Sequence, residues 1–185
     1  MLKKLIFVVL AILMMTTVAF AADESDTELL NDMYNNPKNY ISLGGAGSGI
    51  AIYISKSSVN VQQYSPPKYI IAVQWISVSF TRRQENGIWK DVVYADLGRN
   101  ERYLYDYESK KIYAEDYDNE NNPYWEYLDT KNINDPGTAG RAKSMKMASA
   151  ELAFYWAYNM SFFDKPISWR FKRYMEEGKG TFDDQ

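Results

Sequence analysis

Hydrophobic and polar residues alternate through the middle of the chain, from residue 50 to residue 128. Because successive side chains of a strand point to opposite faces of a sheet, this period of two predicts β-strands. The predicted strands span Ile50–Ile54, Val59–Tyr64, Tyr69–Phe80, Ile88–Ala95, Arg102–Tyr107 and Lys111–Tyr117, with a short additional strand at Tyr124–Leu128.

Turn-forming residues separate these strands. Asn86-Gly87 readily takes the two positive φ values of a tight turn, so it predicts a hairpin between its flanking strands. A second hairpin is expected around Ser109, and the polar segment Ser55–Ser58 is expected to be a turn. The strand Tyr69–Phe80 is apolar on both faces, which is typical of a central, covered strand.

The C-terminal part has the pattern of a helix. The segment Ala142–Phe163 contains no interior proline or glycine, and its large apolar residues recur at spacings of three, four and seven. These residues are Met145, Leu152, Tyr155, Trp156, Met160 and Phe163. Shorter helices are expected at Asp26–Tyr34 and Ser168–Glu177.

Together these elements predict an α+β fold. We expect an antiparallel meander sheet of about six strands, with the long C-terminal helix packed on one face through its aromatic stripe. Residues 22–185 have the size of a single globular domain.

The first residues have the three parts of a secretory signal peptide. Lys3 and Lys4 supply a positive start, Leu5–Met15 is an unbroken apolar run, and Ala19-Phe20-Ala21 is a small-x-small cleavage site. We expect residues 1–21 to be removed after Ala21, which would place the mature protein in the periplasm or outside the cell. A transmembrane anchor is the alternative, but the stretch falls short of the roughly 20 apolar residues that span a bilayer.

The 185-residue chain contains no cysteine and no histidine. These absences exclude disulfides, thiolate nucleophiles, Ser-His-Asp triads, Cys/His zinc sites and the cysteine-linked lipid anchor of a lipoprotein. The formal net charge of −3 makes nucleic acids and anionic membranes poor partners. The sequence predicts no cofactor, and no membrane anchor after cleavage.

The glycine-rich segment Gly44–Gly49 invites a comparison with phosphate-binding loops. The P-loop requires Lys and then Ser or Thr after its last glycine, whereas this chain has Ile50 and Ala51. The dinucleotide fingerprint requires a following helix, whereas a strand is predicted here. We therefore expect a flexible turn that leads into the first strand.

Asp116, Asp118 and Glu120 have the alternate spacing of a calcium-binding EF-hand loop. The sixth position, where that loop has glycine, is Asn121, and the twelfth, where it has a bidentate glutamate, is Tyr127. We expect a solvated hairpin loop and no metal site, with weak binding by these oxygens as the alternative.

Carboxylates are the acid-base groups that remain for an enzyme without histidine or cysteine. A glycosidase-like hydrolase would use two of Asp96, Glu101, Asp106 and Glu115. Carboxylates on strands with Lys and Arg between them are more often a solvated sheet face with cross-strand charge pairs. We expect no catalytic residue among them.

Sixteen per cent of the residues are aromatic, which suits either a core or a binding surface. Tyr103, Tyr105 and Tyr107 share one face of a predicted strand and are flanked by charges, so they are the candidate ligand-binding residues. We expect Trp75 and Trp156 to lie in the core.

The order of three short segments, Ile52–Val59, Tyr105–Tyr113 and Tyr117-Asp118, resembles the bacterial surface-adhesin E-like domain. The resemblance covers residues 50–118 and implies an exported α+β module with an adhesin-like binding role. It supplies no catalytic residue. Three positions depart from the pattern, since Tyr107 stands where that domain has cysteine, Ser55 stands where it has a turn aspartate, and the glycine after the Tyr117-Asp118 turn is absent.

The leading hypothesis is therefore an exported, non-enzymatic binding or adhesin-like module whose partner is a protein or glycan at the cell surface. The alternative is a carboxylate-dependent extracytoplasmic hydrolase.

Overall fold

The structure is a computed structural model that describes residues 27–47, 49–133, 138–178 and 180. The predicted signal peptide, residues 1–21, lies outside the described residues.

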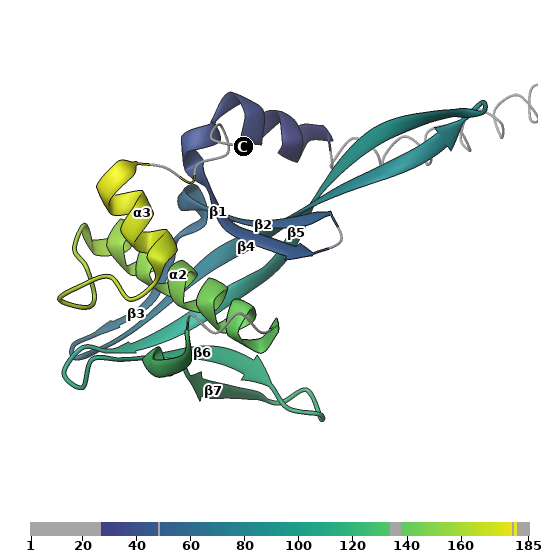
Figure 1. The fold of residues 1–185 in the computed structure, drawn as a ribbon. Coiled ribbons are helices and arrows are strands. Elements are labelled where there is room, and N and C mark those ends of the chain that lie inside the picture. The colour runs from purple at the N-terminus through teal and green to yellow at the C-terminus, as the bar shows by residue number, and fades with distance from the viewer. Residues whose placement is uncertain (1–26, 48, 134–137, 179, 181–185) are drawn as a thin grey trace, which may run out of the picture.

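One antiparallel sheet organises the described part of the chain (Figure 1). Its strand order is β1-β2-β4-β5-β6-β7, and β3 pairs with β4 beside this path. The α+β fold with a meander sheet is therefore confirmed. The strands are β1 (Tyr40–Gly47), β2 (Ile50–Ser55), β3 (Asn60–Ser65), β4 (Lys68–Glu85), β5 (Ile88–Asp106), β6 (Lys111–Tyr117) and β7 (Pro123–Tyr127).

The longest strands, β4 and β5, form the hairpin predicted from Asn86-Gly87. Asn86 has φ 51° and Gly87 has φ 79°, the two positive values that this turn requires. The strands pair from Glu85 and Ile88 back to Lys68 and Asp106. Their distal part extends beyond the other strands as a two-stranded arm (Figure 1). The second predicted hairpin, between β5 and β6, is also present.

The polar segment after β2 does not reverse the chain. It forms a short 3-10 helix, η2 (Lys56–Ser58), and β2 and β3 both run antiparallel to β4. Ser58 fills the gap between them, because its hydroxyl oxygen accepts a hydrogen bond from the backbone N–H of Gln74 at 2.8 Å. The two successive strands β2 and β3 therefore run in the same direction and pair one after the other with β4.

The glycine-rich segment corrects our expectation of a flexible turn. Its first residues, through Gly47, belong to β1 and pair with β2 through two register shifts. Gly44 has φ +106°, a value that L side chains rarely adopt, so glycine permits the bulge at this point. Cross-strand pairing rather than intrinsic propensity creates this strand.

Three helical segments accompany the sheet in the described residues: residues 27–35, α2 (Thr138–Tyr158) and α3 (Trp169–Glu177). Helix α2 ends five residues before the predicted boundary, because Asn159 takes a positive φ of 53°. Ser168 caps the start of α3, where its hydroxyl accepts from the N–H of Arg170, and Gly178 ends it with φ 63°. A 3-10 turn, η3 (Thr130–Asn132), follows β7.

Two hydrophobic cores lie against different parts of β4. Ile71 and Val73 belong to a core that includes β5 and α2 residues, whereas Ile76 and Val78 belong to a second core near residues 27–35. By the strand period of two, these pairs point to opposite faces. The expectation that this strand is apolar on both faces is confirmed.

Candidate binding surface

Two of the three candidate tyrosines are buried. Tyr103 and Tyr105 have 0% of their surface exposed and belong to the larger core. Burial raises the pKa of both phenols well above the usual value. The structure corrects our expectation for this pair: the residues do share one face of β5, but that face is the inner one, where Tyr105 contacts Phe154 of α2 at a ring distance of 5.0 Å.

Tyr107 lies at the end of the same row and is half-buried. Its ring stacks on Phe154 at 6.2 Å and meets Tyr69 edge-on at 6.5 Å. The Lys110 ammonium nitrogen lies 3.5 Å from the centre of the Tyr107 ring and donates a hydrogen bond to the carbonyl oxygen of Phe162 at 3.0 Å. This one candidate therefore keeps access to solvent.

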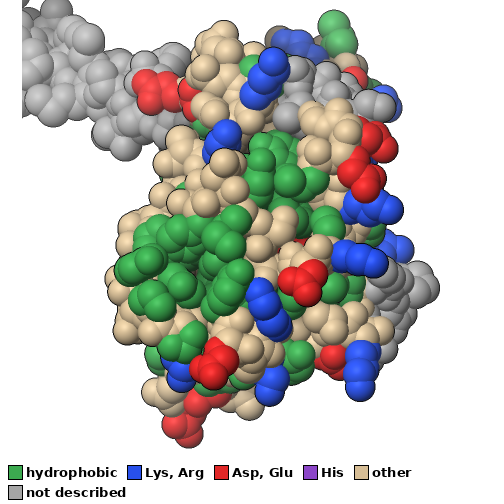
Figure 2. Space-filling model, turned by 90° about the vertical axis from the view of Figure 1, so that its left-hand side faces the viewer, with side chains coloured by type: hydrophobic (Ala, Val, Ile, Leu, Met, Phe, Trp, Pro, Cys, Tyr) green, Lys and Arg blue, Asp and Glu red, His purple; other side chains and the backbone are tan. Residues whose placement is uncertain are grey.

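Tyr107 is part of a cluster that we call the tyrosine surface, made of Tyr64, Tyr69, Tyr107 and Tyr158. Tyr64 lies 5.4 Å from Tyr69 and 6.1 Å from Tyr158, and Tyr69 lies 5.4 Å from Tyr158. Tyr64 is 68% exposed, and the other three are half-buried. Figure 2 shows hydrophobic side chains gathered on this side of the molecule.

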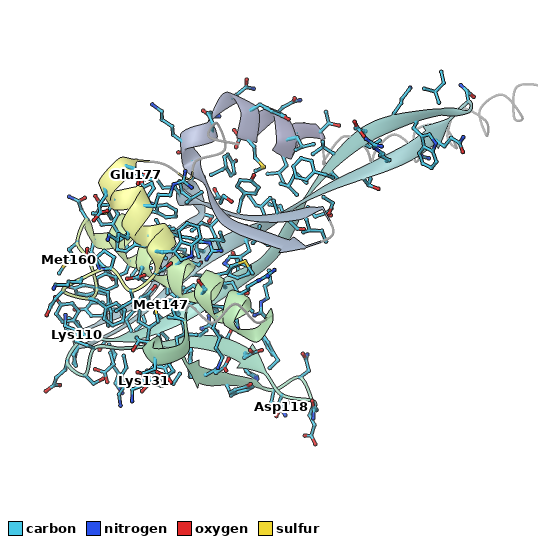
Figure 3. All side chains as sticks on the ribbon, viewed as in Figure 1. Lys110, Asp118, Lys131, Met147, Met160 and Glu177 are labelled. Carbon is cyan, nitrogen blue, oxygen red and sulfur yellow. The ribbon has the colours of Figure 1, made fainter. Side chains whose placement is uncertain are left out.

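Four elements supply the tyrosine surface: β3, the start of β4, the segment just after β5, and the last residue of α2. Phe154 supports it from beneath, with ring distances of 6.0 Å to Tyr69 and 4.9 Å to Tyr158. Lys110 and Met160 lie at this same end in Figure 3, and Met160 is 44% exposed. The surface is therefore preorganised by a rigid core.

Sequence reasoning missed Tyr64, Tyr69 and Tyr158. Each occupies the end of an element, where neither the strand period nor the helix period assigns a face. The available signal was a tyrosine at or next to one end of each of β3, β4 and α2, close to a turn. Only the pairing of these ends in space brings the rings together.

Two of the candidate carboxylates are buried and bound to arginines. Glu101 forms an ion pair with Arg99. Glu115 pairs with Arg102 and accepts a hydrogen bond from the Tyr117 hydroxyl at 3.3 Å.

The other two lie at the surface. Asp96 is exposed, and Asp106 accepts a hydrogen bond from the N–H of Ser109 at 3.2 Å, which lowers the pKa of Asp106. Solvent, a turn or an arginine thus contacts each of the four carboxylates, and Glu101 keeps one buried oxygen, Oε2, without a hydrogen-bond partner.

The acidic loop stabilises its own turn. Asp118 accepts hydrogen bonds from the N–H groups of Asn122 at 2.8 Å and Glu120 at 2.9 Å, and these bonds lower the pKa of Asp118. Asp116 instead binds the Lys146 ammonium at 2.8 Å, which lowers its pKa. Among the residues described, no group of three acidic side chains is placed to hold a metal ion.

Glu151 is a buried acid that sequence reasoning did not identify. Its two carboxylate oxygens accept hydrogen bonds from the backbone N–H groups of Ile167 at 2.7 Å and Ser168 at 2.8 Å. Burial nevertheless raises the pKa of Glu151 to about 7. The residue ties α2 to the segment that enters α3, so we assign it a structural role.

No family model matches the chain, and neither does a curated protein or a solved structure. Within the described ranges, none of the helices is both long and apolar enough to traverse a bilayer.

Proposed function

We propose that this chain is an exported, non-enzymatic binding module that uses the tyrosine surface to contact a protein or glycan at a cell surface. The observation that carries the proposal is the partly exposed, ring-to-ring cluster of Tyr64, Tyr69 and Tyr158. Tyrosine combines a large apolar area with a hydroxyl group, and it is enriched among the residues that dominate binding energy.

Rigidity also supports the proposal. Interactions gain affinity when the contacting groups are already held in place, because little side-chain entropy is then lost on binding. The rings of the tyrosine surface touch one another and rest on buried Phe154. We propose that α2 serves as the long helix that packs on one face of the sheet and holds this support.

The same proposal includes the route to the cell surface. Residues 1–21 would be removed as a signal peptide, and residues 22–185 would act as one domain in the periplasm or outside the cell without a membrane anchor. An adhesin-like role would agree with the resemblance to the surface-adhesin E-like domain. The arginine partners of Glu101 and Glu115 do not favour the hydrolase alternative.

A retention experiment tests the proposal. The purified protein is applied to immobilised bacterial polysaccharides and to whole bacterial and host cells. The Tyr64→Ser/Tyr107→Ser variant should bind at least about tenfold more weakly than the unaltered protein, since truncation of a binding hot spot costs 2 kcal/mol or more. Tyr124→Ser is the matched control, because Tyr124 is 46% exposed on β7, away from the cluster.

Equal retention of the double variant and the control would refute the tyrosine surface as the binding site, and so would the absence of binding to every probe. Glycoside turnover by the purified protein, abolished by neutralising one of Asp96, Glu101, Asp106 or Glu115, would instead establish the hydrolase alternative.

A further inference from the structure

A small cavity of about 70 Å³ lies between β1 and α3. Ser42 and Gly44 line it from β1, and Trp169, Arg170 and Arg173 line it from α3. Its volume is several times the roughly 10–15 Å³ that one water molecule requires. The cavity shares no residue with the tyrosine surface, so it raises a separate question.

Arg170 is held in this cavity by contacts on several sides. Its Nη1 donates a hydrogen bond to the Ser144 hydroxyl oxygen at 2.8 Å, and its guanidinium carbon lies 4.5 Å from the centre of the Trp169 ring. A Cβ atom at position 44 would come within 2.7 Å of Nη2. Glycine at this position thus makes room for the guanidinium group, and the bulge in β1 is shaped around it.

The guanidinium of Arg170 has no carboxylate partner among the described residues. This is unusual for a half-buried charge, because removal from water is costly unless an opposite charge compensates. Burial lowers the pKa of Arg170, yet the group keeps its charge at any ordinary pH. One of its five N–H donors is used by Ser144, so most of its hydrogen-bonding capacity is available.

Two further donors border the same cavity. Arg173 lies one helical turn after Arg170 on the same side of α3, and its exposed pair with Glu177 is long, at 3.7 Å. The Ser42 hydroxyl accepts from the N–H of Gly44 at 3.3 Å and can donate its own hydrogen. None of the side chains that line the cavity is acidic.

We propose that the cavity between β1 and α3 binds a small oxyanion, a carboxylate or phosphate group, through Arg170, with Arg173 and Ser42 as additional donors. The planar fork of a guanidinium matches both groups with two parallel hydrogen bonds. Partial exclusion of water strengthens such charge-assisted bonds.

The test titrates the purified protein with inorganic phosphate and with acetate, replacing chloride at constant ionic strength. Calorimetry and the thermal midpoint report binding. Arg170→Gln should raise the dissociation constant at least about tenfold, because it removes charge-assisted hydrogen bonds. Arg170→Lys should restore only part of the affinity, since it keeps the charge and loses the fork. Arg82→Gln is the control, because Arg82 forms an exposed ion pair on the distal arm.

The proposal is overturned if the protein shows no response to phosphate or acetate that depends on Arg170. Should Arg170→Gln fail to fold, two other variants keep the test decisive. Gly44→Ala places a Cβ atom 2.7 Å from Nη2, and Arg173→Gln removes the second guanidinium. Each should weaken the response, and an unchanged response in both would also refute the site.

Discussion

Tyr105 of β5 donates its hydroxyl hydrogen to the backbone carbonyl oxygen of Ala150 in α2, at 2.8 Å. Both residues are fully buried, and the Tyr105 ring also lies 5.4 Å from Phe162. This single bond fixes one turn of α2 relative to β5. It therefore also fixes Phe154, which supports the tyrosine surface one helical turn further along.

Removal of this hydroxyl should destabilise the protein without leaving a cavity. We expect Tyr105→Phe to lower the free energy of unfolding by about 1 kcal/mol, as loss of one buried hydrogen bond does. Urea denaturation measures the change. Tyr124→Phe, at an exposed position on β7, is the control and should leave the midpoint unaltered. Equal stability of the two variants would mean that the bond contributes nothing.

Phe154 and Trp156 should differ in their contributions to stability. Phe154 is 2% exposed at the centre of the aromatic core, whereas Trp156 is half-buried and donates to the Tyr174 hydroxyl at 3.2 Å. We expect Phe154→Ala to cost about 3–5 kcal/mol and Trp156→Ala clearly less. Denaturant unfolding of both variants provides the comparison. A larger loss of stability for Trp156→Ala would mean that the face of α2 that carries Trp156, and not the face that carries Phe154, packs in the main core.

Glu151 should make the protein less stable as the pH rises. Its pKa is raised from 4.5 to about 7 in the folded chain, so the folded state binds the proton more tightly than the unfolded state. Protonation of Glu151 makes its full contribution to the free energy of unfolding below about pH 4.5. This contribution is lost as the pH rises from that value to about 7. The shift corresponds to roughly 3 kcal/mol.

The measurement is the free energy of unfolding across this range, compared with that of Glu151→Gln. The variant cannot titrate, so the decline between pH 4.5 and 7 should disappear from its profile. Asp116 and Asp118 have lowered pKa values, and their contribution has the opposite sign and falls at lower pH. If the two proteins have parallel stability profiles, Glu151 is already ionised in the folded protein across this pH range.

Sequencing of the native protein tests the predicted export. We expect the mature chain to begin at Ala22 and to fractionate with soluble periplasmic or secreted material. N-terminal sequencing and cell fractionation provide the measurement. Recovery of an intact segment 1–21 in the membrane fraction would contradict cleavage and would support an anchor.

Local signals predicted the hairpins but could not predict every strand. Asn86-Gly87 specifies its turn through its own backbone preferences, so a few residues of sequence suffice. Strand β1 has no such signal, because glycines are poor strand formers in isolation. It exists because β2 provides a pairing partner, and glycine at position 44 leaves room for Arg170 beside the bulge.

The sequence predicted only part of the candidate site, because contacts between residues far apart in the chain decide which tyrosines are covered. A period of two correctly places Tyr103 and Tyr105 on one face, yet it cannot say which face is covered. That depends on Ala150 and Phe154, more than 40 residues later in the chain. Tyr107 is only half-buried because it lies beyond the end of β5, where its ring meets Tyr69.

The length of the β4–β5 hairpin has a consequence for the order of folding. Pairing can begin at Asn86-Gly87 and proceed away from the turn, with each new pair closing only a short loop. We expect the hairpin to form on a nascent chain before α2 has been synthesised. Until Thr138–Tyr158 emerges, Tyr103 and Tyr105 lack the α2 residues that share their core, so the incomplete chain is most prone to self-association during that interval.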